Sequence, residues 1–275
     1  MTKNKLTKNL IIILATFLLL VWLFPYLYLV SSAFKPSQEV FSTPVKFFPT
    51  RLSLENFRNM FERMPFFKYL FNSISAAILS TILAVSLGSL SAYAIARTTG
   101  KRLSLFMLVL VLMMKMIPIS SIAVPIYEIV MDLGIYDTKL ALVIVYAAIN
   151  IPFVIWMMIS FYSNIPTSID EAAAIDGASN LATFRKIIFP IVLPGIMSAS
   201  IFTLFLSLND FLIALLLTSV EAKTFTVAIS EFVNSYNYDL GPMMAGAFLF
   251  SFPVIVISFM AQKYIVSGMT SGSIK

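Results

Sequence analysis

Six apolar stretches, each long enough to cross a lipid bilayer as a helix, constrain the fold of this chain more than any other feature. A hydrocarbon core about 30 Å thick requires roughly 20 apolar residues of helix. Because 59% of the 275 residues are hydrophobic and 12% are charged, lipid must solvate much of the apolar surface. The sequence therefore predicts an all-α membrane protein with six transmembrane helices, at 10–31, 69–96, 103–127, 140–162, 191–218 and 240–266.

The first apolar stretch follows three basic residues, and small residues near its end resemble a signal-peptidase cleavage site. Its apolar run is about 21 residues long, whereas the apolar region of a signal peptide has about 7–15. We therefore expect a retained helix, which together with an N-terminal cytoplasmic tail forms the segment 1–33.

Loop charges favour an orientation with both termini in the cytoplasm. The short loop 97–102 holds three basic residues, whereas most of the basic residues assigned to the outside lie in the long loop 34–69, and long loops weigh less. The expected organisation is then an external loop at 34–69, a five-helix core at 70–266 and a cytoplasmic tail at 267–275.

Composition excludes several kinds of chemistry. The chain has no Cys and no His, which removes disulfides, thiolate chemistry, haem ligation and nearly all zinc or copper sites, so no metal site is expected. It also removes the commonest acid–base catalyst near neutral pH. The net charge of +6 suits basic loops against anionic lipid headgroups better than nucleic-acid binding.

A phosphate-binding loop is also absent from the sequence. Gly100-Lys101 is followed by Arg102 where the motif requires Ser or Thr, and Ile95 stands where its first Gly should be. We therefore expect neither an enzyme nor a bound cofactor, and any ATP work must come from another polypeptide.

The external loop 34–69 contains four prolines and a stretch at 54–61 with the pattern of a short amphipathic helix. It is either a solvated connector or a docking surface for an external partner.

The loop 163–190 predicts two short helices outside the membrane. Ser168 and Glu171 have the spacing of a capping box, and Pro166 blocks extension of the helix backwards. Asp170 and Glu171 place negative charge in the first turn, three alanines follow, and Gly177 can adopt the left-handed conformation that ends a helix.

The second short helix would carry Leu181, Phe184 and Ile188 on one face, and Pro190 would mark the entry to the next span. An acidic first helix suits an anionic leaflet poorly, which favours docking to a protein over contact with lipid.

Within this loop, Glu171-Ala172-Ala173, three residues, Gly177, nine residues, Ile187, one residue and Phe189-Pro190 resemble a known signature. It is the EAA signature of the membrane subunits of binding-protein-dependent ABC importers, E-A-A, x3, G, x9, I-x-L-P. Phe189 replaces its Leu, an exchange of one large apolar residue for another. The resemblance extends over about 72–266.

Further segments are similar to the carbohydrate-import branch of that family, in particular to the shorter partner of a maltose-permease-type heterodimer. They lie at 116–118, 125–127, 133–138, 175–179 and 209–215. The resemblance implies a type I ABC importer permease fold with an N-in topology, in a bacterial or archaeal cytoplasmic membrane. The implied solute is a sugar, an oligosaccharide or a polyol.

The resemblance also implies partners: a second permease subunit, two copies of an ABC ATPase subunit and an extracytoplasmic solute-binding protein. It implies that the following residues couple the ATPase to the permease: Glu171, Ala172, Ala173, Ala174, Asp176, Gly177, Ile187 and Pro190. An importer of another nutrient and a secondary transporter remain alternatives, although a secondary transporter needs ionisable residues in its spans and only two qualify.

Polar residues inside the spans are candidates for a solute path. Lys115 lies about midway along the third stretch, and it either lines that path, reaches the interface or pairs with an acid of a neighbouring subunit. Asn209 and Asp210 interrupt the fifth stretch and either contact the solute or form packing contacts between helices. Asn150 is a further candidate, although Asn150, Pro152, Pro118 and Pro125 first indicate kinks.

Overall fold

The computed structural model describes residues 2–98, 100–234 and 237–270 and is almost entirely helical in that part of the chain. A two-residue antiparallel ribbon pairs Val233 with Tyr238 and Asn234 with Asn237. The elements are α1 (Thr2–Ala33), η1 (Ser37–Glu39), α2 (Glu55–Arg63), α3 (Phe66–Ala96), α4 (Lys101–Met116), α5 (Ile119–Asp132), α6 (Lys139–Ser163), α7 (Ser168–Ile175), α8 (Asn180–Thr183), η2 (Phe184–Ile188), α9 (Phe189–Leu208), α10 (Leu212–Leu217), α11 (Phe225–Ser230), β1 (Val233–Asn234), β2 (Asn237–Tyr238) and α12 (Leu240–Thr270).

The predicted class of an all-α membrane protein is confirmed. Five helices of the described residues are long and apolar enough to cross a membrane, and the pair α4–α5 makes a sixth crossing if it is counted as one span. The tail predicted at 267–275 lies outside the described residues from 271 onwards.

The third predicted span is not one straight helix. α4 ends at Met116 and α5 begins at Ile119, and the two helices meet at 88°. Pro118 has no N–H to donate and forces Ile117 into an extended conformation, so the α-helix cannot run through this point. Lys115 lies in the last turn of α4 beside the bend, still about midway along the bent pair. Pro125 and Pro152 lie inside continuous helices.

The fifth predicted span is also broken. α9 ends at Leu208, three residues intervene, and α10 begins at Leu212. The Asp210 carboxylate accepts the N–H groups of Ile213 and Ala214, each at 3.1 Å, and so satisfies donors in the first turn of α10. The hydroxyl of Thr226 donates to the Asp210 carbonyl at 2.8 Å, which holds the break in place.

The chain divides into two compact units. The first comprises the chain up to Phe67 with Ala228–Ile255, and the second comprises Lys68–Val227 with the chain from Val256 onwards. In the first unit, α2 confirms the short amphipathic helix predicted around 54–61. Its buried Asn56 donates from Nδ2 to the carbonyls of Ser32, Ala33 and Lys35, which satisfies carbonyls at the end of α1.

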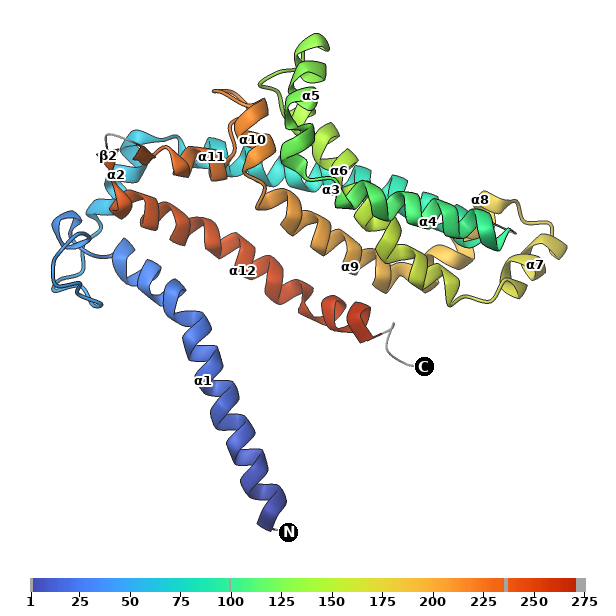
Figure 1. Cartoon of the computed structure of the whole chain (residues 1–275), viewed down its shortest axis with the longest axis horizontal. Coiled ribbons are helices and arrows are strands. Elements are labelled where there is room, and N and C mark those ends of the chain that lie inside the picture. The colour runs from blue at the N-terminus through green and yellow to red at the C-terminus, as the bar shows by residue number, and fades with distance from the viewer. Residues whose placement is uncertain (1, 99, 235–236, 271–275) are drawn as a thin grey trace. The chain divides into compact units, whose positions relative to one another are not determined.

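In the second unit, α6 packs against both α9 and α4 (Figure 1). Two glycines allow close approach. A Cβ on Gly88 of α3 would lie 2.8 Å from the side chain of Val154, and one on Gly195 of α9 would lie 2.7 Å from the ring of Phe161. Small residues at such points let membrane helices pack backbone to backbone. α7 and α8 connect α6 to α9 at one end of this helix layer (Figure 1).

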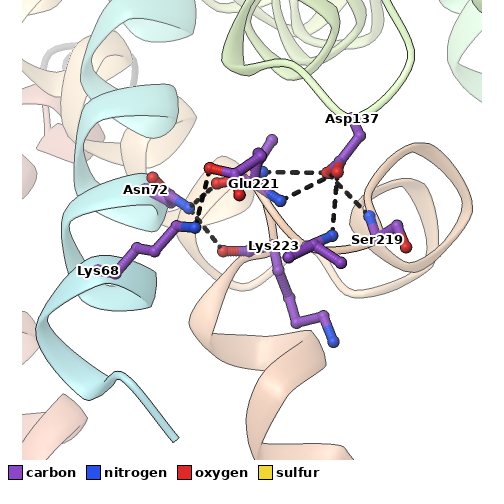
Figure 2. A network of polar contacts seen from close by, with 8 residues as sticks. Lys68, Asn72, Asp137, Ser219, Glu221 and Lys223 are labelled. Carbon is purple, nitrogen blue, oxygen red and sulfur yellow. Dashed lines mark hydrogen bonds and ion pairs between the residues drawn. The ribbon is translucent and has the colours of Figure 1, made fainter.

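At the corner between α5 and α6, Asp137 holds the loop that follows α10. Its carboxylate accepts backbone N–H groups from Ser219, Val220, Glu221 and Ala222 at 2.9–3.0 Å (Figure 2). Burial raises the pKa of this carboxyl, but the four N–H donors outweigh that effect and lower the pKa to about 2.

The same loop is held from α3. The Nδ2 of Asn72 donates to the carbonyls of Glu221 and Lys223 at 2.8 and 3.0 Å, and Lys68 pairs with the Glu221 carboxylate at 2.9 Å (Figure 2). The segment after α10 is therefore fixed by two separate elements of the second unit.

Candidate functional site

α7 has one face against the protein and one face exposed. Ala173 is 4% exposed, and Ile169 packs against the hydrophobic cluster formed by α3, α6 and α9. Glu171, Ala172, Ala174, Asp176 and Gly177 are all exposed, and Ile175 is exposed by 87%. Of the coupling residues predicted within 171–177, all but Ala173 therefore lie on a free surface of the chain.

The predicted capping box at the start of α7 is wrong. The N-cap residue is Thr167, and its side chain makes no capping hydrogen bond. Thr167 is itself helical in conformation, and its carbonyl accepts the N–H of Glu171 at 3.0 Å. The helix thus begins one residue earlier than predicted, which places Ser168 inside its first turn.

The predicted end of α7 is confirmed. Gly177 has φ +79°, the left-handed region that favours glycine. The N–H of Ala178 bonds to the Ala173 carbonyl at 2.9 Å, and the N–H of Gly177 bonds to the Ala174 carbonyl at 3.0 Å. This pair of bonds is the Schellman motif, which fixes the direction in which the chain leaves α7.

The second short helix predicted in this loop does not end before the next span. α8, capped by the Ser179 hydroxyl, continues through the π-helical turn η2 into α9. An α-helix would bring the ring of Pro190 against the carbonyl of Lys186, and the wider turn just before it relieves that clash. Ile187 lies in this turn, and Pro190 lies in the first turn of α9, at the predicted entry to that helix.

A polar cluster ties α7 to α3, and sequence reasoning missed it. Arg97 follows α3 directly and pairs through Nη2 with the Asp170 carboxylate at 2.8 Å. The Tyr93 hydroxyl donates to the other oxygen of Asp170 at 2.5 Å. Arg97 also donates through Nη1 to the carbonyls of Tyr162 and Ile165, each at 3.2 Å. Arg97 directly follows the apolar stretch 69–96 and Asp170 lies in the loop after the stretch 140–162, but neither position predicts that the two residues pair.

The four residues predicted for a solute path line one cavity of about 560 Å³. Lys115 comes from α4, Asn150 from α6, and Asn209 and Asp210 from the break between α9 and α10. Aromatic rings of Phe202, Phe205 and Phe211 line the same cavity. The structure therefore brings together candidates that lie far apart in the sequence.

Two of these residues also have packing partners. Buried Asn150 donates from Nδ2 to the Ser207 hydroxyl at 3.2 Å, and the Ser80 hydroxyl donates to the same oxygen at 3.2 Å. This bridge joins α3, α6 and α9. Asn209 is exposed and donates to the Phe205 carbonyl at 2.9 Å.

Lys115 is exposed, and its Nζ lies 5.8 Å from the centre of the Phe153 ring. Among the described residues, it makes no ion pair with a carboxylate.

Tyr146 is a cavity residue that sequence reasoning missed. It is 3% exposed, and its hydroxyl lies beside the Asp210 carboxylate. A tyrosine in an apolar stretch gives no sequence signal of such a position, because the neighbouring elements determine which way the hydroxyl points.

Comparison with known proteins gives a match to one family model and to many relatives. Residues 84–271 match the family described as "Binding-protein-dependent transport system inner membrane component". The chain is 35% identical to the trehalose transport system permease protein SugB of Mycobacterium tuberculosis, over 92% of each chain. It is 32% identical to the trehalose/maltose transport system permease protein MalG of Thermococcus litoralis, over 100% of this chain and 99% of the relative.

Solved structures share the fold. A chain of a bacterial ABC transporter that imports the acidic polysaccharide alginate superposes with a TM-score of 0.77 at 20% identity, covering 95% of this chain and 97% of its own length. A chain of the MetNI methionine ABC transporter superposes with a TM-score of 0.60 at 18% identity, covering 76% of this chain and 98% of its own length.

Proposed function

The chain belongs to the family of inner membrane components of binding-protein-dependent transport systems, and we propose that it carries a sugar, an oligosaccharide or a polyol through the cavity between α4, α6 and α9. It is a multi-pass permease subunit of an ABC importer in the inner membrane. A separate ATPase subunit drives the transport by binding the exposed face of α7.

The observation that carries the solute proposal is the convergence of Lys115, Asn150, Asn209 and Asp210 on one cavity. A neutral sugar is recognised by hydrogen-bond donors and acceptors placed over apolar or aromatic surface. The cavity offers both kinds of group, and the buried Tyr146 hydroxyl beside Asp210 adds a further polar group.

The names of several relatives support the same class of solute. Two are named for trehalose or for trehalose and maltose, and a relative from Agrobacterium fabrum, 30% identical, is named for sulfoquinovosyl glycerol. The methionine transporter shares the fold, so the fold alone does not select the solute.

The coupling proposal assigns the loop 163–190 to the cytoplasm, with both termini on the same side. Glu171, Ala172, Ala174, Asp176 and Gly177 form an exposed surface of small and acidic residues, which another protein can approach closely. Ala173 packs inward beneath this surface, whereas Ile187 lies in the π-helical turn before α9 and Pro190 lies in the first turn of α9.

The proposed assembly has this chain, a second permease subunit, two copies of an ABC ATPase subunit and an external solute-binding protein. ATP and Mg²⁺ bind to the ATPase. One of the structural neighbours is named as an alginate ABC transporter in complex with a periplasmic protein, which supports a partner of that kind.

Reconstitution of the complex in liposomes tests the proposal. Uptake of labelled trehalose and maltose is measured with ATP, without ATP and with a protonophore. The proposal expects uptake that needs ATP and survives the protonophore, together with ATPase subunits that copurify with this chain. Uptake that persists without ATP and collapses with the proton gradient would instead identify a secondary transporter.

A further inference from the structure

The cluster of Arg97, Asp170 and Tyr93 joins α7, the helix to which the ATPase is proposed to bind, to α3. Only four residues separate the end of α6 at Ser163 from the start of α7 at Ser168. This short connection joins α7 to α6, and the polar cluster joins α7 to α3.

Both oxygens of the Asp170 carboxylate are occupied by groups of α3 and its next residue. Oδ2 pairs with Arg97 and Oδ1 accepts the Tyr93 hydroxyl. The side chains of Arg97 and Asp170 are only 15% and 21% exposed, so solvent screens this ion pair less than a surface pair. The ion pair holds the carboxylate beside Arg97, and the hydrogen bond from Tyr93 fixes its direction.

Arg97 also holds the end of α6. Its Nη1 donates to the Tyr162 and Ile165 carbonyls, which lie at and just beyond the last turn of that helix. A single guanidinium thus joins the end of α3, the end of α6 and the first turn of α7. The planar fork of arginine suits such a junction, because its donors keep a fixed geometry that the ammonium of lysine lacks.

From α3 the connection continues to the cavity. Gly88 of α3 lies against Val154 of α6, and the Ser80 hydroxyl bonds to Ser207, which lines the cavity together with Asn150. A displacement of α3 would therefore disturb Ser207 and Asn150, two polar groups that line the proposed solute cavity.

We propose that Arg97 and Asp170 are positioning residues that make α7 and α3 move together, so that a movement of the ATPase at α7 reaches the solute cavity through α3. This inference rests on the proposed docking of the ATPase at α7. The chain itself joins α7 to α6 and, through α8, to α9. The contacts of Arg97 and Asp170 add a second connection, through α3.

The test needs only ATP and Mg²⁺ as probes, because it follows the protein rather than the solute. The chain has no cysteine, so one introduced at exposed Ala94 of α3 can carry an environment-sensitive fluorophore. The complex is purified with partner subunits that lack reactive cysteines. Arg97→Gln and Asp170→Asn are compared with Arg102→Gln and Asp132→Asn, which alter exposed charges that make no ion pair among the described residues.

The inference expects the label to respond to ATP in the parent complex and in both control variants. In Arg97→Gln and Asp170→Asn, the response should fall by about fivefold or more, while the ATPase still copurifies and hydrolyses ATP. Asp170→Glu keeps the carboxylate and should restore the response, which a loss of folding would not predict.

Three results would overturn the inference and leave the proposed function standing: no response of α3 in the parent complex, an undiminished response in both cluster variants, or loss of the ATPase from these variants alone. Absence of the ATPase from the parent complex would instead refute the proposed function. The two proposals therefore fail in different ways.

Discussion

Gly195 of α9 lies directly against the ring of Phe161 of α6, with two ring carbons 2.7 Å from where a Cβ would stand. Gly195→Ala should therefore destabilise the protein by about 1–3 kcal/mol, because the ring or one helix has to move. The midpoint of thermal unfolding in detergent measures this effect.

Gly100→Ala is the matched control. A Cβ at Gly100 would meet the Leu103 Cβ at 3.6 Å, an ordinary contact, and its φ of −87° suits any residue. We expect a loss of at most about 1 kcal/mol at this N-cap position, where glycine is preferred to alanine. Equal midpoints for the two variants would contradict the close packing of α6 and α9.

Gly177→Val should uncouple transport while leaving the protein in the membrane. No atom lies within 4 Å of a Cβ at this position, so the cost arises from the backbone. At φ +79° a β-branched residue is strained by about 1–2 kcal/mol or more, which favours loss of the turn that ends α7. Uptake in liposomes and the membrane content of the variant are the two measurements.

Gly177→Asn separates backbone strain from side-chain bulk, because asparagine tolerates the left-handed region. We expect its uptake to stay near that of the parent protein. Full uptake by the valine variant would count against a role of this turn in coupling.

Acid should release the loop after α10 only well below neutral pH. The pKa of Asp137 is lowered to about 2, so its stabilising effect is complete above the unfolded value near 4 and is lost as the pH falls towards 2. A spin label at exposed Val220 should show constant mobility from pH 7 to about 4 and rising mobility below.

Asp137→Asn should leave the same label mobile throughout, because an amide oxygen binds four N–H donors less well than a carboxylate. Glu221→Gln is the control, since it removes only the ion pair with Lys68, which is exposed and contributes at most about 1 kcal/mol. If the label became mobile in Glu221→Gln but not in Asp137→Asn, the ion pair of Glu221 with Lys68, and not Asp137, would hold the loop.

Variants of Asp210 distinguish capping from contact with the solute. Asp210→Asn keeps an oxygen that can accept the N–H groups of Ile213 and Ala214, whereas Asp210→Ala removes it at a cost of about 1 kcal/mol. If Asp210 also binds the solute, Asp210→Asn should raise the KM of uptake about tenfold without lowering the unfolding midpoint. An unchanged KM would leave capping as its role.

Much of the fold could be predicted from the sequence because a helix needs roughly 20 apolar residues to cross the hydrocarbon core of a bilayer. α6 and α12 begin within a residue of the predicted spans, since an apolar run of that length has few alternatives to a helix in a bilayer. The bends were harder to predict. Pro118 was visible, but the 88° between α4 and α5 depends on how α5 packs, and the break at Asp210 depends on Thr226 and the first turn of α10.

For the candidate site, local rules predicted the end of α7 but not its start. Gly177 ends the helix because glycine readily adopts the positive φ that the turn requires. Thr167, and not Ser168, is the N-cap residue, and its helical dihedral angles could not be predicted from the spacing of Ser168 and Glu171. The pairing of Arg97 with Asp170 joins residues far apart in the sequence, and the shared cavity joins three separate segments. Both arise only after the helices have packed.

The hydroxyl of Ser207, shared between Ser80 and Asn150, restricts how three helices can rearrange during a transport cycle. If α3, α6 or α9 slid along a neighbour by even one residue, about 1.5 Å, a polar atom in apolar surroundings would lose its partner at a cost of about 1–3 kcal/mol. Gating that preserves this bridge must therefore move the three helices together instead of sliding one along another.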